Sequence, residues 1–176
     1  MTENKPRHRV FFALWPDAEL RAALAVLAGS IPADGRPVPA AHFHLTLAFP
    51  GTVGHDVAAA MSARADGLRP SGIRLSLDQL GWFRRPRVAW IGPARNVPEL
   101  EALAAEMRRV CEVSGAVMED RPFRPHVTLR RDVRRFDAID VEPLVWQPRE
   151  MVLIESGRNG HPGAYRVLRS WPVAPD

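Results

Sequence analysis

Short apolar runs alternate along this chain with segments in which apolar residues recur every three or four positions. Val10–Leu14 is a continuous apolar run typical of a buried strand, and leucines recur at helical spacing between Asp17 and Ala28. The whole pattern predicts the order β-α-β-α-β-β-α-β-β-β, and therefore an α+β fold. The expected strands are Val10–Leu14, His42–Phe49, Ile73–Leu77, Arg87–Ile91, Arg124–Arg130, Met151–Ile154 and Tyr165–Leu168. The first expected helix is capped by Asp17 and runs to about Ala28, the second covers Asp56–Leu68, and the third follows a cap at Asn96 and runs to about Val113.

The boundaries of these elements carry signals of their own. Pro50 and the glycine after it are expected to end the strand that begins at His42. Asn96 and Glu99 have the spacing of a capping box, and Pro98 would then lie in the first turn of the last helix. The segment 81–85, rich in aromatic and basic residues, is expected to be an exposed turn.

The tetrapeptide His-x-Thr-Leu occurs twice, and each copy lies in an expected strand. The copies are His44-Leu45-Thr46-Leu47 and His126-Val127-Thr128-Leu129. Residues two apart in a strand point to the same face, so each histidine shares a face with its threonine, and the apolar positions between them face a core. The repeat in matching context predicts two related lobes within a single domain, 1–176, rather than two independent domains.

Two His/Thr pairs suit the in-line cleavage of a phosphodiester. This reaction needs a base for the attacking oxygen and an acid for the leaving oxygen, and histidine serves both roles near neutral pH. Thr46 and Thr128 could hold the non-bridging oxygens of the phosphate, and arginine would stabilise the charge that builds on them. Strand parity places Arg130 on the face of the second pair, and His42 on the face of the first.

Composition narrows the picture only slightly. The 176 residues carry a net charge of +4, which suits an anionic ligand without requiring one. Cys111 is the only cysteine, so an intrachain disulfide and a cysteine zinc site are both excluded, and its apolar helical position predicts a buried structural thiol. No apolar run approaches the roughly 18 residues that span a bilayer, and the N-terminal run is too short for a signal peptide, which favours a cytoplasmic protein.

Other interpretations of the same residues remain open. Each motif histidine could be an ordinary hydrogen-bonded strand residue, or His42, His44 and His126 could bind zinc with a further ligand. Trp82 and Phe83, beside arginines, could stack on a nucleobase. The remaining histidines, His8, His55 and His161, lie in expected tails or loops and are expected to be solvated.

The motifs resemble those of the 2H phosphoesterase superfamily, and in particular those of the bacterial and archaeal RNA 2′,3′-cyclic phosphodiesterases, also described as 2′-5′ RNA ligases. The similarity includes the segments 9–14, 44–49, 81–83 and 121–129. The resemblance implies a bilobal fold, with antiparallel sheets, outer helices and a central cleft to which each lobe contributes one motif. It also implies a cofactor-free, metal-independent opening of the 2′,3′-cyclic phosphate at an RNA end to a 2′-phosphate, and reversible 2′-5′ joining of tRNA halves in related members.

By the same resemblance, His44 is the proton donor to the leaving 3′ oxygen and His126 is the base that activates water. Thr46 and Thr128 hold the phosphate together with an arginine. The family pattern favours Arg131 for this role, whereas strand parity favours Arg130. The expected partner is RNA with a cyclic phosphate end, and the expected state is a monomer. The alternatives are a phosphodiesterase for a small cyclic nucleotide and a protein that binds RNA ends without turnover.

Overall fold

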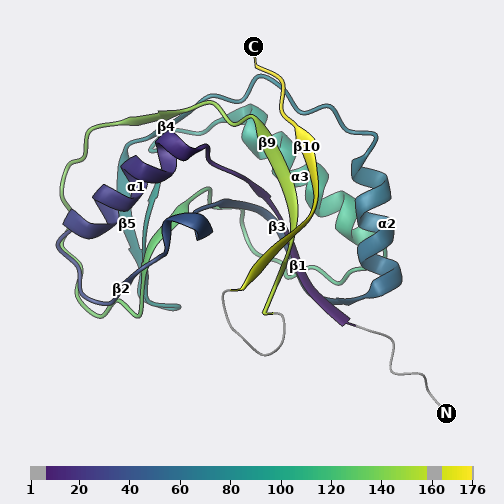
Figure 1. The fold of residues 1–176 in the computed structure, drawn as a ribbon, viewed down its shortest axis with the longest axis horizontal. Helices are drawn as coiled ribbons and strands as arrows, with labels where there is room; N and C mark the ends of the chain where they lie inside the picture. The colour runs from purple at the N-terminus through teal and green to yellow at the C-terminus, as the bar shows by residue number, and fades with distance from the viewer. Residues whose placement is uncertain (1–6, 158–163, 176) are drawn as a thin grey trace.

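The computed structural model describes residues 7–157 and 164–175, and these form an α+β structure with antiparallel sheets. A large sheet runs in the order β10-β9-β1-β3-β7-β6-β5, with β2 paired to β7, and β4 and β8 form a separate pair (Figure 1). The strands are β1 (Arg7–Leu14), β2 (Arg36–Pro37), β3 (Leu45–Gly54), β4 (Leu75–Leu77), β5 (Gln79–Phe83), β6 (Val88–Gly92), β7 (Val127–Arg131), β8 (Leu144–Trp146), β9 (Glu150–Ser156) and β10 (Tyr165–Pro172), and the helices are α1 (Ala18–Ser30), α2 (His55–Ala65), α3 (Pro98–Val113) and the 3-10 turn η1 (Ala40–His42).

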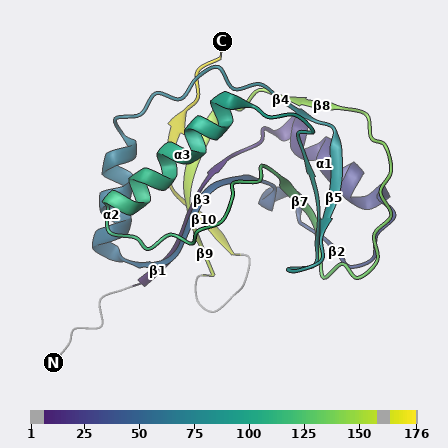
Figure 2. The ribbon, with the colours of Figure 1, turned by 180° about the vertical axis from the view of Figure 1, so that it is seen from behind.

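The large sheet has two halves that meet at a single residue pair. β1, β3, β9 and β10 form one half, β2, β5, β6 and β7 form the other, and the only Cα pairing between β3 and β7 is Leu45 with Val127. Helix α1 packs on the β7 half, whereas α3 packs on β3 beside α2. Figures 1 and 2, viewed from opposite sides, show the helices separated in this way along the sheet.

The apolar stripes of the helices face the sheet and form the core, as their spacing predicted. In α1 the buried positions include Leu20 and Leu24, and in α3 they include Leu100, Leu103 and Met107. Leu45 and Val127, the residues that join the two halves, are completely buried in the same core. Burying this apolar face holds the strands that carry the two motifs in one fixed register.

The end of β3 differs from the prediction. Pro50 and Gly51 do not end the strand, because a register shift in the pairing with β1 accommodates them and β3 continues to Gly54. Gly51 adopts a φ of 74°, which glycine tolerates without strain. The shift also moves Phe49 out of the core: it is 42% exposed, and its ring lies 6.1 Å from that of Phe11.

Two further expectations about element ends were wrong. Helix α3 begins at Pro98, one residue later than a cap at Asn96 predicts, and its N-cap Val97 has no side-chain capping bond. The segment expected as a turn at 81–85 is mostly strand, because β5 extends to Phe83 and pairs with β6. The turn itself comprises the basic residues that follow.

Candidate active site

The register of β3 and β7 gathers both motifs around one residue pair. His44 and His126 are each the residue immediately before their strand, and Leu45 lies opposite Val127 in an antiparallel arrangement. Continuing that register places His44 across from Thr128 and Thr46 across from His126. All four are partly exposed, on the face opposite the buried Leu45 and Val127. His44 and His126 are then diagonal neighbours, and such residues lie about 7–8 Å apart, a spacing that suits a phosphate held between two rings.

Both histidine rings are oriented by the same backbone contact. Nδ1 of His44 lies 2.7 Å from the carbonyl oxygen of His42, and Nδ1 of His126 lies 2.7 Å from the carbonyl oxygen of Arg124. Because a carbonyl oxygen only accepts, each Nδ1–H must be the donor. Nε2 is then the nitrogen left for chemistry in both rings, able to accept a proton when neutral and to donate one when charged.

Each histidine is walled by aromatic rings from its own half of the sheet. The His44 ring lies 4.9 Å from Phe11, 5.5 Å from Tyr165 and 6.3 Å from Trp15, which it stacks on. The His126 ring lies 5.1 Å from Phe83 edge-on and 6.2 Å from Trp90. These rings limit the access of water to both imidazoles. The imidazole nitrogens are therefore polar atoms within largely aromatic surroundings.

Of the two aromatic residues proposed for base stacking, the structure brings only Phe83 to the histidines. Trp82 lies opposite Ala89, packs against the core, and has its ring 6.4 Å from that of Phe136. Sequence reasoning missed Trp90, although alternation within β6 places it on the opposite face from the buried Ala89 and Ile91. It also missed Tyr165, whose distance in sequence from His44 left no local signal.

Gly81 fixes the position of the Trp90 ring. A Cβ atom at residue 81 would lie 2.1 Å from the nearest ring carbon of Trp90, so only glycine fits beneath the indole. We expect Gly81→Ala to displace Trp90 from its place beside His126, lowering stability by about 1–3 kcal/mol and lowering turnover as well. Urea unfolding and initial rates measure the two effects. Wild-type values for both would contradict the packing argument.

A bulge in β7 decides which arginine shares the face of the motif. Thr128 pairs with Trp90 and Arg130 with Ala89, so the pairing skips Leu129, and Arg131 then pairs with Val88. Residues 88 and 90 lie on the same face of β6, which places Arg131 on the face of Thr128. Strand parity without the bulge predicts Arg130 at this place.

Arg130 is held by the main chain on the opposite side. Its guanidinium donates to the carbonyl oxygens of Ala28 (2.7 Å), Gly35 (2.9 Å) and Asp34 (3.1 Å), which ties β7 to the end of α1 and the loop after it. This geometry gives Arg130 a structural role and differs from the phosphate contact inferred from parity.

Burial shifts both candidate catalytic histidines toward the neutral form. The pKa of His44 is lowered to about 4, mainly by burial and also by the nearby charges of Arg131 and His126, while the bond to the His42 carbonyl opposes the shift. The pKa of His126 is lowered as well, mainly by burial and then by Arg131. Burial also lowers the pKa of His42, and the charge of Arg131 lowers it further, so this arginine acts on all three rings.

The other described histidines, His8, His42 and His55, differ in their burial and contacts. His42 ends η1 rather than lying in a strand, and its ring lies 4.7 Å from that of Tyr165. His8 is not a solvated tail residue, because it is half-buried and its Nδ1 lies 2.5 Å from Glu155. His55 is exposed, as expected, and His161 lies outside the described residues.

Neither a metal site nor a reactive thiol emerges near the motifs. Within residues 7–157 and 164–175, no group of three or more His, Cys, Asp or Glu side chains could hold a metal ion, and His42, His44 and His126 do not form one. Cys111 is fully buried in α3, and burial raises its pKa to about 12, in agreement with a structural thiol. None of the described helices is both long and apolar enough to cross a membrane.

Two antiparallel strands thus present two His/Thr motifs around one residue pair. This arrangement is characteristic of one class of protein, and comparison with known families identifies the same class. The chain belongs to the 2′-5′ RNA ligase superfamily, whose family model matches residues 9–159.

Comparison with individual proteins shows which members of this superfamily the chain is similar to. The chain is 38% identical over 137 residues to the RNA 2′,3′-cyclic phosphodiesterase of Escherichia coli, covering 77% of each protein. It is 36% identical over 140 residues to the enzyme of the same name from Aeropyrum pernix, covering 76% of this chain and 78% of the relative. The crystal structure of E. coli LigT complexed with 3′-AMP superposes with a TM-score of 0.83 at 33% identity, over 96% of this chain and 99% of that one. The chain is therefore a homologue of RNA 2′,3′-cyclic phosphodiesterases.

Proposed function

We propose that this protein opens the 2′,3′-cyclic phosphate at the end of an RNA to a 2′-phosphate, with His44 as proton donor and His126 as proton acceptor. We further propose that residues 1–176 form one bilobal domain, in which the two halves of the large sheet border a central cleft lined by both motifs. The observation that carries the proposal is the matched Nδ1–H bond of each ring to a backbone carbonyl, which leaves both Nε2 atoms for proton transfer. The chain's relatives from Escherichia coli and Aeropyrum pernix are RNA 2′,3′-cyclic phosphodiesterases, which supports this substrate.

The proposed reaction is a single in-line displacement. His126 Nε2 takes a proton from water as the water oxygen bonds to phosphorus, and the bond from phosphorus to O3′ breaks as His44 Nε2–H protonates that oxygen. The phosphate remains on O2′, His44 ends neutral and His126 ends protonated, and proton exchange with water restores the pair. Thr46 and Thr128 donate to the non-bridging oxygens, and Arg131 balances their charge. Reversible 2′-5′ joining would use the same groups with a 5′-hydroxyl in place of water.

The pH dependence tests the assignment of His44. As donor His44 must carry a proton, yet its pKa in the free protein is about 4. A phosphate anion between the rings favours the charged imidazole, so we expect the pKa of His44 to rise when the 2′-phosphate product of a mononucleotide binds. Histidine-selective NMR titration with and without that product measures the shift. A free His44 pKa at or above 6.5 would contradict the burial that the structure shows.

The kinetic counterpart follows from the same two pKa values. Raising the pH removes the proton from His44, and lowering the pH protonates His126, so kcat/KM should follow a bell. Because both pKa values are lowered, the centre of that bell should lie below pH 6.5. Measuring initial rates across the pH range at constant ionic strength gives the profile.

The product of the reaction separates the proposed function from its alternatives. An RNA oligonucleotide with a 2′,3′-cyclic phosphate end, incubated in excess EDTA, should give the 2′-phosphate alone. Turnover only after zinc or manganese is added would place the histidines in a metal site. Turnover of free cyclic nucleotides without turnover of the oligonucleotide would favour a small-molecule phosphodiesterase, and binding without turnover would favour an RNA-end-binding protein.

A further inference from the structure

We propose that a strip of arginines beside His126 binds the phosphate backbone of the RNA upstream of its cyclic end, so that the enzyme favours polynucleotides over single nucleotides. This strip, called the arginine rim below, rests on the proposed function for the identity of its ligand. It consists of Arg36, Arg84, Arg85, Arg87, Arg131, Arg134 and Arg135.

Three separate segments are brought together to form the arginine rim. The β5–β6 turn carries Arg84, Arg85 and Arg87, and the backbone carbonyl of Arg87 accepts from the amide of Val133 at 2.9 Å. β2 pairs with β7 so that Arg36 lies opposite Arg131. The loop before β2 is tied to the segment after β7, because an Asp34 carboxylate oxygen accepts from the amides of Arg134 and Arg135.

The rim carries a large excess of positive charge. All seven arginines are exposed, and the acidic residues tied to them are Asp34, held by two backbone amides, and Asp132, which pairs with Arg36 at 2.6 Å. In the described part of the chain, no salt bridge joins Arg85, Arg87 or Arg131 to a carboxylate, although the charges of Arg87 and Arg131 act on Asp132. Arg84 lies over the Trp82 ring at 5.3 Å. Arginine side chains that form no salt bridge within the protein are available to bind a ligand.

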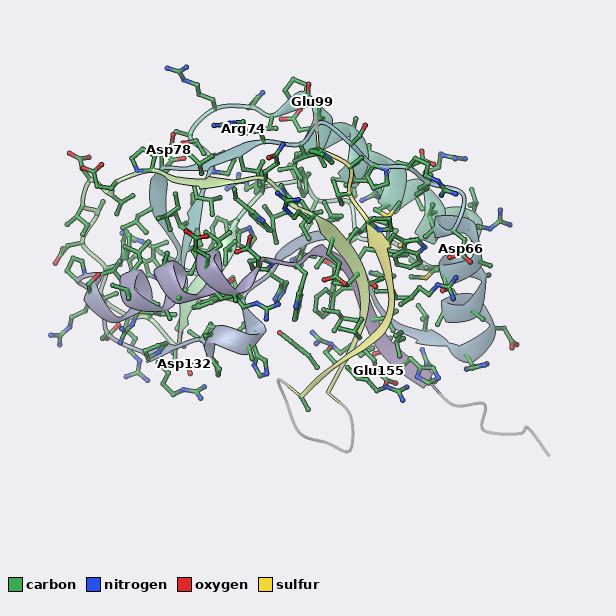
Figure 3. All side chains as sticks on the ribbon, turned by 45° about the horizontal axis from the view of Figure 1, so that its top comes forward. Asp66, Arg74, Asp78, Glu99, Asp132 and Glu155 are labelled. Atoms are coloured by element: carbon green, nitrogen blue, oxygen red, sulfur yellow. The ribbon has the colours of Figure 1, made fainter. Side chains whose placement is uncertain are left out.

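The rim is continuous with the site. Val88 pairs with both Phe83 and Arg131, and Phe83 forms the edge of the wall around His126. Figure 3 shows Asp132 at the lower edge of the half that carries α1, far from Arg74 at the top of the molecule and from Glu155 in the other half. A chain whose last phosphate lies between the histidines can therefore place its preceding phosphates along the rim on the His126 side.

Nucleic acid is the ligand that fits this surface. Each phosphate neutralised by an arginine releases a counterion, so single-stranded binding weakens with salt by a slope of about 0.7 per contact on logarithmic axes. Guanidinium groups also bind phosphate oxygens in pairs, which lysine does not do.

The test compares two substrates and two variants. Arg85→Gln/Arg87→Asn neutralises two rim positions, and asparagine suits the φ of 65° at residue 87. Arg64→Gln/Arg74→Gln makes the same change of charge at exposed positions outside the rim. The substrates are an oligoribonucleotide of about ten residues with a 2′,3′-cyclic phosphate end and cytidine 2′,3′-cyclic monophosphate. Binding of the oligonucleotide is also measured by fluorescence anisotropy in a His44→Ala/His126→Ala background, where turnover does not interfere.

The rim variant should raise KM for the oligonucleotide on the order of tenfold at low salt and reduce the salt slope by about 1.4, with the mononucleotide unaffected. The control variant should match wild type. Unchanged oligonucleotide binding in the rim variant, with normal turnover, would overturn the rim and leave the proposed function standing. If the wild type turned over neither substrate, the proposed function would be wrong. The anisotropy measurement would still show whether the arginine rim binds RNA. Equal, rim-dependent binding of polyglutamate would assign the surface to acidic protein and overturn the proposal.

Discussion

Replacing His44 or His126 by alanine is expected to lower kcat on the oligonucleotide by about 10²–10⁴-fold, because each change removes one of the two proton-transfer groups. The two single variants should be impaired in separate ways. Loss of the donor leaves the 3′ oxygen to depart unprotonated, and loss of the base leaves water unactivated. Single-turnover rates in EDTA with saturating enzyme measure the chemical step without interference from substrate binding.

His42 provides a matched control for that experiment. Its backbone carbonyl orients His44, but its ring does not make that bond, so His42→Ala retains the contact. We expect this variant to stay within a few-fold of wild type. Thr46→Val and Thr128→Val should fall between the two extremes, since each removes one hydrogen bond to the phosphate. If either motif histidine could be replaced without loss of rate, the catalytic assignment would be wrong.

Arg131→Gln is expected to lower kcat/KM by about 10²–10³-fold with little effect on unfolding, because it removes an arginine charge that acts on both rings. Arg130→Gln should show the reverse pattern. It leaves three backbone carbonyl oxygens without their donor, so it should lower the free energy of unfolding by about 1–3 kcal/mol and leave the chemical step of the folded fraction nearly unchanged.

Urea midpoints and kcat/KM for both variants decide between the two arginines. The comparison is matched because the residues are adjacent on one strand and the substitution is identical. A catalytic defect in Arg130→Gln together with a stability defect in Arg131→Gln would mean that the bulge does not govern the functional face. That result would restore the assignment by simple strand parity.

The sequence predicted the features that repeat or alternate locally. The double His-x-Thr-Leu motif and the helical spacing of leucines need only neighbouring residues, and the structure places both motifs around one pair and both leucine stripes in the core. The bulge at Leu129 depends instead on how β7 fits against β6, and nothing local to β7 marks it. The aromatic walls likewise come from strands far apart in the chain, so their rings carry no shared periodicity.

The errors have a common physical origin. Pro50 and Gly51 form a sequence pair that predicts the end of a strand, yet a register shift beside Gly51 lets β3 continue. The spacing of Asn96 and Glu99 predicts a cap at Asn96, whereas the helix begins at Pro98 and is preceded by Val97. In each case neighbouring strands or a rigid ring outweighed a residue preference worth about 1 kcal/mol.

The orientation of each motif histidine comes from a carbonyl only two residues earlier in its own segment. Each ring therefore has its own support, and neither needs a side chain from the other half to be aligned. Loss of one ring should leave the other correctly oriented, so a descendant of this chain could shed one proton-transfer group and keep an intact anion-binding imidazole. A catalytic protein with this architecture can therefore become an anion-binding protein by losing the histidine of one half of the sheet.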